Sequence, residues 1–134
     1  MASYERERAR NAYKKQLDYF KNEMRYELRN YPVIDFDAKM KIKFKAMGLK
    51  RECLDNYRES CRGIEYDEKR HEHVDCFKQL TLKTIKNKNI HVLQYEEDLM
   101  EGLDKVIRNI DILTDDNKEK MIFLNDFACY TARF

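Results

Sequence analysis

Residues 13–32 read YKKQLDYFKNEMRYELRNYP, and the spacing of their apolar side chains decides the fold class. The large apolar residues recur at steps of three and four, which places them along one face of an α-helix. Pro32 then ends the run, because proline lacks the amide hydrogen that a helix interior needs. We therefore predict a helix over residues 4–30. Its apolar stripe consists of Tyr13, Leu17, Phe20, Met24, Leu28 and Tyr31.

Length and composition extend this prediction to the whole chain. A chain of 134 residues corresponds to a single domain over residues 1–134. Only three glycines and one proline leave few positions for the tight turns of an all-β sandwich or barrel. We therefore predict a mainly α-helical bundle of about four to five helices, with an α+β fold as the alternative.

The segment over residues 34–46, IDFDAKMKIKFKA, has an apolar residue at every second position. Such alternation is typical of a β-strand, which is our preferred interpretation. The other face of this strand would be a row of lysines, Lys39, Lys41, Lys43 and Lys45. Alanine, methionine and lysine also favour helices. A helix here would instead gather on one face Phe36, Met40, Phe44 and Met47.

Residues 80–95 hold a second candidate β element, in which LTLKTIK and IHVLQY flank Asn87, Lys88 and Asn89. The threonine, isoleucine and valine side chains favour a β-hairpin around these three residues. The leucines would serve a helix equally well. Both interpretations stay open, so a small β element over 34–46 and 80–95 belongs to the prediction.

The remaining segments are predicted to be helical. Gly63 separates two of them, since glycine suits the left-handed conformation at a helix end. The first carries Leu49, Cys53, Tyr57 and Cys61, and the second carries Val74, Phe77 and Leu80. A third amphipathic helix, which ends at residues 114–116, is marked by Leu99, Leu103, Val106, Ile110 and Leu113. An aromatic stripe predicts a last helix from Asp116 to the chain end, through Phe123, Phe127, Tyr130 and Phe134.

Motifs for common catalytic chemistries are absent from the sequence. Ser3 and Ser60 are the only serines, and neither lies in the G-x-S-x-G turn of a hydrolase nucleophile. The three glycines form no phosphate-binding loop. The segment HEHVDC at residues 71–76 has zinc-ligand chemistry, but on a helix only His73 and Cys76 would share a face. We therefore predict no enzyme, with no catalytic, cofactor-binding or metal-binding residues.

The cysteines suggest a second interpretation. Helices packed antiparallel on either side of Gly63 would bring Cys53 opposite Cys76, where a disulfide bond could join them. In this respect the sequence resembles the coiled-coil-helix-coiled-coil-helix proteins of the mitochondrial intermembrane space, to which KRHEHVDC at residues 69–76 is similar. Their paired cysteines are spaced more widely than Cys53 and Cys61, and Tyr66 stands in place of a fourth cysteine. The resemblance implies a complex subunit with a cysteine-stapled helical hairpin, whereas unbonded cysteines would pack as small apolar residues.

The first predicted helix carries candidate partner-binding residues. Tyr19 and Tyr26 lie beside its apolar stripe and widen it, and Arg25 and Arg29 lie nearby. Tyrosine and arginine are enriched in protein interfaces. We therefore predict a protein-interaction or assembly subunit that binds a protein partner or forms a homo-oligomer through this helix.

Charge and targeting patterns complete the sequence predictions. The net charge of +2 marks no general nucleic-acid binder. The lysine row at 39, 41, 43 and 45 could still bind phosphates, so nucleic-acid binding is the alternative function. No stretch of the sequence is apolar enough for a membrane span or a secretory signal. These features predict a cytoplasmic protein, with the mitochondrial intermembrane space as the alternative.

Overall fold

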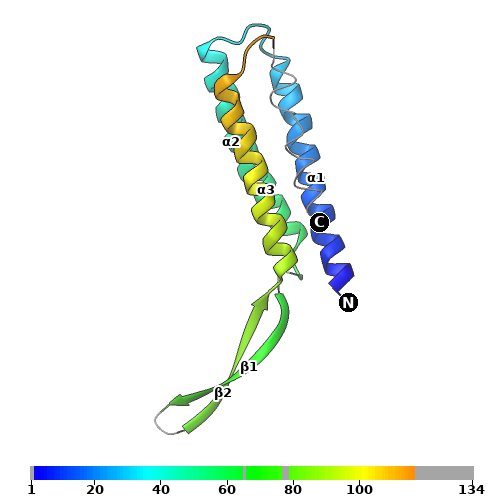
Figure 1. Ribbon diagram of the computed structural model, residues 1–134, viewed down its shortest axis with the longest axis vertical. Helices are drawn as coiled ribbons and strands as arrows, with labels where there is room; N and C mark the ends of the chain where they lie inside the picture. The colour runs from blue at the N-terminus through cyan, green and yellow to red at the C-terminus, as the bar shows by residue number, and fades with distance from the viewer. Residues whose placement is uncertain (1, 65, 77–78, 117–134) are drawn as a thin grey trace.

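The structure is a computed structural model that describes residues 2–64, 66–76 and 79–116, of which residues 2–3, 66–76 and 79–87 are described by their backbone alone. Three α-helices, α1 (Ala2–Leu28), α2 (Phe36–Ser60) and α3 (Ile90–Asn109), lie side by side in Figure 1. A short 3-10 helix, η1 (Ile110–Ile112), extends α3. Between α2 and α3, strands β1 (Tyr66–Cys76) and β2 (Gln79–Lys88) form an antiparallel hairpin that extends from one end of the bundle (Figure 1).

The mainly α-helical fold class is confirmed. The described part of the chain contains three α-helices, fewer than the predicted four to five. The predicted last helix, with its aromatic stripe, begins at Asp116 and lies almost entirely outside the described residues. The single domain over residues 1–134 therefore stays a prediction.

The predicted stripe of α1 forms one wall of the core. Tyr13, Phe20 and Met24 are fully buried, and Leu17 and Leu28 nearly so. They pack with the buried faces of α2 and α3 in one hydrophobic cluster, and Tyr31 packs partly buried against it. The helical spacing of the opening segment is therefore confirmed.

The predicted strand over residues 34–46 is wrong, because residues 36–46 form the first part of α2. The Asp35 side chain caps this helix by accepting a hydrogen bond from the Ala38 amide at 2.8 Å. An alternating pattern also places apolar residues four positions apart, and residues at that spacing lie on the same face of a helix. Ala38, Ile42 and Ala46 share one face of α2 and are buried in the bundle. Their fit between helices outweighed the strand pattern.

The predictions for residues 64–95 are corrected in part. The segment with Val74 was expected to be helical, but β1 covers residues 66–76 and pairs with β2. Gly63 does adopt the left-handed region, with φ of 95°. The expected hairpin around residues 87–89 is wrong, since β2 ends at Lys88 and α3 begins at Ile90. Asn89 is instead the helix cap, where its side-chain oxygen accepts hydrogen bonds from the amides of His91 and Val92.

Removal of this cap tests the boundary between β2 and α3. We expect Asn89→Ala to lower the free energy of unfolding by about 1 kcal/mol, because the substitution leaves two amides at the helix start without their acceptor. Urea denaturation followed by circular dichroism would measure the change. Gln94→Ala, at an exposed position on the same helix, is the matched control and should stay within about 0.5 kcal/mol of the wild type. Equal effects of the two variants would contradict the capping role.

Candidate interaction surface

Four large apolar side chains lie exposed along the outer face of α2. We call them the α2 stripe; their exposed fractions are 75% for Phe36, 37% for Met40, 64% for Phe44 and 51% for Met47. They recur at steps of three and four and therefore form one continuous face of the helix. Single exposed apolar residues are ordinary, whereas a contiguous exposed row makes this face a candidate interaction site. The sequence did not predict this candidate site, although the helical alternative for residues 34–46 grouped the same four residues.

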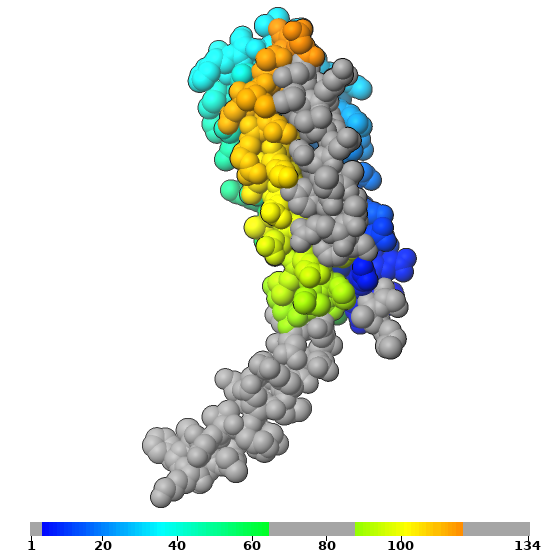
Figure 2. Space-filling model, in the orientation of Figure 1, coloured from blue at the N-terminus to red at the C-terminus, as the bar shows by residue number. Residues whose placement is uncertain are grey.

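An open groove of about 600 Å³ continues the stripe between α2 and α3. Its apolar lining comes from Met47, Leu54 and Ile107. Gly48 also lines the groove, and a Cβ atom built on it would meet nothing within 4 Å. In Figure 2, the first half of α2 (cyan) and the end of α3 (orange) lie next to each other along one side of the molecule. The groove and the stripe therefore form one apolar path along α2.

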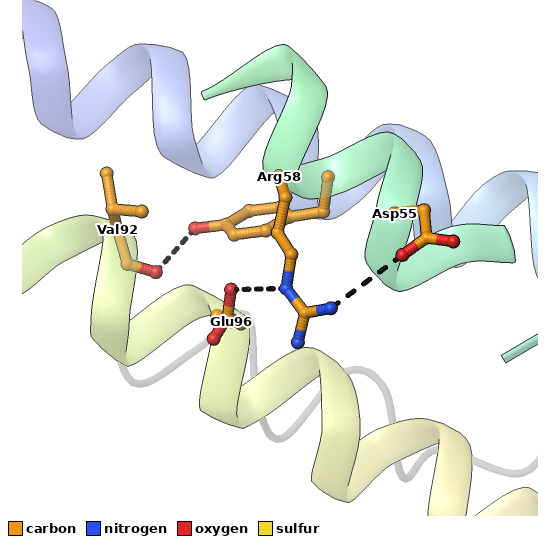
Figure 3. Close-up of polar contacts among 5 residues, drawn as sticks. Asp55, Arg58, Val92 and Glu96 are labelled. Carbon is orange, nitrogen blue, oxygen red and sulfur yellow. Dashed lines mark hydrogen bonds and ion pairs between the residues drawn. The ribbon is translucent and has the colours of Figure 1, made fainter. Parts of the chain in front are cut away.

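Ion pairs join α2 to α3 and η1 beside this path. The paired residues recur every seven or eight positions, about two helical turns, along both α2 and the α3–η1 segment. Because the two segments are antiparallel, the first residue of the series on α2 pairs with the last on η1. The pairs are Arg58 Nε to Glu96 Oε2 at 3.1 Å, Lys50 Nζ to Asp104 Oδ1 at 2.6 Å, and Lys43 Nζ to Asp111 Oδ1 at 2.9 Å. In Figure 3, Arg58 also reaches Asp55 at 3.7 Å. Such exposed pairs contribute only about 0.2–1 kcal/mol each, so their main effect is on the antiparallel register of the groove walls.

A buried hydrogen bond holds the two helices together behind these ion pairs. The Tyr57 hydroxyl donates to the carbonyl oxygen of Val92 at 2.7 Å, and Figure 3 shows this bond at Val92. Tyr57 is fully buried. Burial is the largest cause that raises the pKa of its hydroxyl above the ordinary 10.0, so the group stays protonated and keeps donating.

The predicted lysine row is not a single surface. Because residues 39–45 are helical, Lys39 and Lys43 lie on one flank of the α2 stripe and Lys41 and Lys45 on the other. Lys39 Nζ donates to the Asp111 carbonyl oxygen at 3.2 Å, and Lys43 pairs with the carboxylate of the same residue. Lys41 and Lys45 are exposed. The prediction of a strand with evenly spaced lysines is therefore wrong. The four lysines lie instead on the two flanks of the α2 stripe.

The predicted partner-binding residues of α1 have different environments. Tyr19 packs partly buried against the core, and its hydroxyl donates to Glu52 Oε1 at 2.7 Å. This hydrogen bond is the largest cause that raises the pKa of Tyr19 to about 12. Arg25, Tyr26 and Arg29 are exposed, with 66% of Tyr26 accessible. Most rings of α1 are thus covered within the bundle, and the outer face of α2 exposes more apolar surface.

The predicted stapled hairpin is wrong. Cys53 is a free, fully buried thiol whose Sγ lies 3.6 Å from the Gln16 carbonyl oxygen of α1. Cys76 lies on β1 rather than on a helix antiparallel to α2. Burial, and secondarily the charge of Glu52, raises the pKa of the Cys53 thiol to about 12. Cys53 and Cys61 therefore pack as small apolar residues, the alternative that the sequence had left open.

The described residues contain neither a metal-binding cluster nor a membrane-spanning helix. No group of three or more histidine, cysteine or acidic side chains able to hold a metal ion occurs among them. None of the helices described has both the length and the apolar character needed to cross a bilayer. In comparisons with protein-family models, with curated proteins and with solved structures, the chain matches none of them.

Proposed function

We propose that this protein is a non-enzymatic interaction or assembly subunit that binds a protein partner through the α2 stripe and the adjoining groove. The observation that carries the proposal is the continuous exposure of Phe36, Met40, Phe44 and Met47 on a helix whose opposite face is in the core. Covering these side chains with a partner would remove apolar surface from water, which is the main favourable term in protein association. The proposal moves the predicted binding surface from α1 to α2.

The proposal places this subunit in the cytoplasm. Two cysteines support this compartment, because neither Cys53 nor Cys61 forms a disulfide bond and both are buried in the core. Protein disulfides belong chiefly to oxidising compartments, whereas reduced thiols are typical of the cytoplasm.

Affinity capture from the native source tests the proposed function. The full-length protein would be immobilised, its bound proteins identified, and the affinity of the purified partner measured by calorimetry. We expect Phe44→Asp to weaken that affinity by 30-fold or more, the size of effect typical of an interface hot spot. Phe44 is largely exposed, so the variant should keep the fold, as circular dichroism would verify.

Tyr26→Asp on α1 is the matched control, because Tyr26 is an aromatic residue with nearly the same exposed fraction as Phe44. It should leave the affinity within twofold of the wild type. A loss of binding with Tyr26→Asp and not with Phe44→Asp would return the surface to α1. The absence of any specific partner would count against an interaction function.

A further inference from the structure

We infer that the partner presents an acidic amphipathic helix, which lies along the α2 stripe with its apolar face in the groove and its carboxylates against the flanking cations. This inference rests on the proposed function and adds the chemistry of the partner. It is carried by the charges around the stripe, by the shape of the groove, and by the poor fit of the stripe to a second copy of itself.

The surface around the stripe has an excess of positive charge. Residues 36–54, the extent of the apolar path, contain six cations and two acids, Asp37 and Glu52. The cations are Lys39, Lys41, Lys43, Lys45, Lys50 and Arg51. Asp104 and Asp111 lie across the groove and pair with Lys50 and Lys43. Six positive charges against four carboxylates leave an excess of two, and a partner surface of negative potential would complement them.

Three of these cations are available for a partner. Lys41, Lys45 and Arg51 are exposed, and none of them forms an ion pair with another described residue. Lys41 and Lys45 lie one turn apart on one flank of the stripe, and Arg51 lies beyond Met47 at the groove. Carboxylates on the flanks of an amphipathic helix would meet these cations while its apolar residues cover the stripe.

The dimensions of the apolar path suit a helix. From Phe36 to Leu54 the path follows α2, and the rise of 1.5 Å per residue makes it about 27 Å long. A ligand helix of about 18 residues has the same length. A groove between two helices accepts the ridge of apolar side chains on such a helix, which is a recurrent mode of peptide recognition.

A second copy of this chain is a poor occupant. In a two-fold symmetric dimer through the α2 stripe, each basic flank would meet a basic flank of the other copy, the same flank if the helices are antiparallel and the opposite flank if they are parallel. Lysines of the two copies would then be brought together, and like charges brought together across an interface weaken binding. The charges therefore favour a partner of different sequence.

Peptide binding tests the inference directly. The probe is a fluorescein-labelled 18-residue amphipathic helix with leucines on one face and glutamates on both flanks, compared with the same peptide carrying lysines in place of the glutamates. By fluorescence anisotropy with the full-length protein, we expect the acidic peptide to bind at least tenfold more tightly. The preference should weaken as salt is raised, since salt screens charge interactions. No preference for the acidic peptide would overturn the inference.

Charge reversal on the protein supplies the second arm. Lys41→Glu combined with Lys45→Glu should weaken binding of the acidic peptide by tenfold or more and improve binding of the basic one. Arg25→Glu combined with Arg29→Glu, two exposed arginines at the same spacing on α1, is the matched control and should change either affinity by less than twofold. Equal effects of the two double variants would contradict a site on α2.

Two results separate this inference from the proposed function. If Phe44→Asp weakens binding of the natural partner while the Lys41 and Lys45 reversal leaves it unchanged, the interaction function stands and the acidic helix is overturned. If neither change has an effect, both fail. Vesicles of phosphatidylcholine with about one third phosphatidylserine form the last comparison. Binding to these vesicles that is stronger than to the acidic peptide and is lost with Phe44→Asp would overturn the inference in favour of an anionic membrane surface.

Discussion

Replacing Phe20 with alanine should lower the free energy of unfolding by about 3–5 kcal/mol, the usual cost of removing a buried phenyl ring. Phe20 is fully buried in the cluster that joins α1, α2 and α3, so the substitution would leave a cavity among all three helices. Small domains are stable by only about 5–15 kcal/mol, so this variant would lose a large part of its stability. Urea denaturation at pH 7, with the wild type measured in parallel, would give the difference.

Phe44→Ala is the control for this prediction, because it removes the same ring from a site where 64% of the side chain is exposed. We expect it to change the free energy of unfolding by no more than about 0.5 kcal/mol. The pair of variants therefore separates the face of the bundle that stabilises the fold from the face proposed to bind a partner. A cost at Phe44 as large as that at Phe20 would mean that the α2 stripe is part of the core.

Raising the pH from 9 to 12 should strongly destabilise the protein. The pKa of the buried Cys53 thiol is raised from 9.0 to about 12, chiefly by burial. Above pH 9 the unfolded chain therefore loses the Cys53 proton before the folded protein does, so the unfolded state is favoured more as the pH rises. A pKa difference of this size corresponds to about 4 kcal/mol lost by pH 12. Tyr57 and Tyr19, whose pKa values are also raised, should add to the loss above pH 10.

Cys53→Ala isolates the contribution of the thiol to this pH dependence. The variant lacks the titrating group, so its stability should fall between pH 9 and 12 by about 4 kcal/mol less than that of the wild type. Comparing the slopes rather than the absolute stabilities removes the cost of the small cavity. The measurement is a series of urea denaturation curves at half-unit steps of pH. Identical slopes in the two proteins would show that Cys53 titrates at its ordinary pKa in the folded protein.

The sequence predicted the elements whose local pattern and tertiary role agree. The stripe from Tyr13 to Leu28 has a single apolar face, so its period could be interpreted in one way, and that face is buried. Gly63 was expected at a left-handed position and adopts one. The prediction of a helix over residues 66–76 was wrong because charged residues and histidines dominate this segment and leave too few apolar positions to define a period. Their strand depends on pairing with β2, which is a contact between segments and not a local property.

The candidate site was missed because α2 carries two apolar rows and a helix is buried only where neighbours contact it. The row of Ala38, Ile42 and Ala46 and the row of Phe36, Met40 and Phe44 have the same spacing, so no local pattern states which of them is covered. The sequence alone determined the mainly helical class and the buried face of α1. Only the tertiary structure decided that the alanine-containing row of α2 faces the bundle and that the row of Phe36, Met40 and Phe44 faces outward. Burial depends on which helices the fold brings alongside α2. Small side chains such as alanine allow those helices to approach closely.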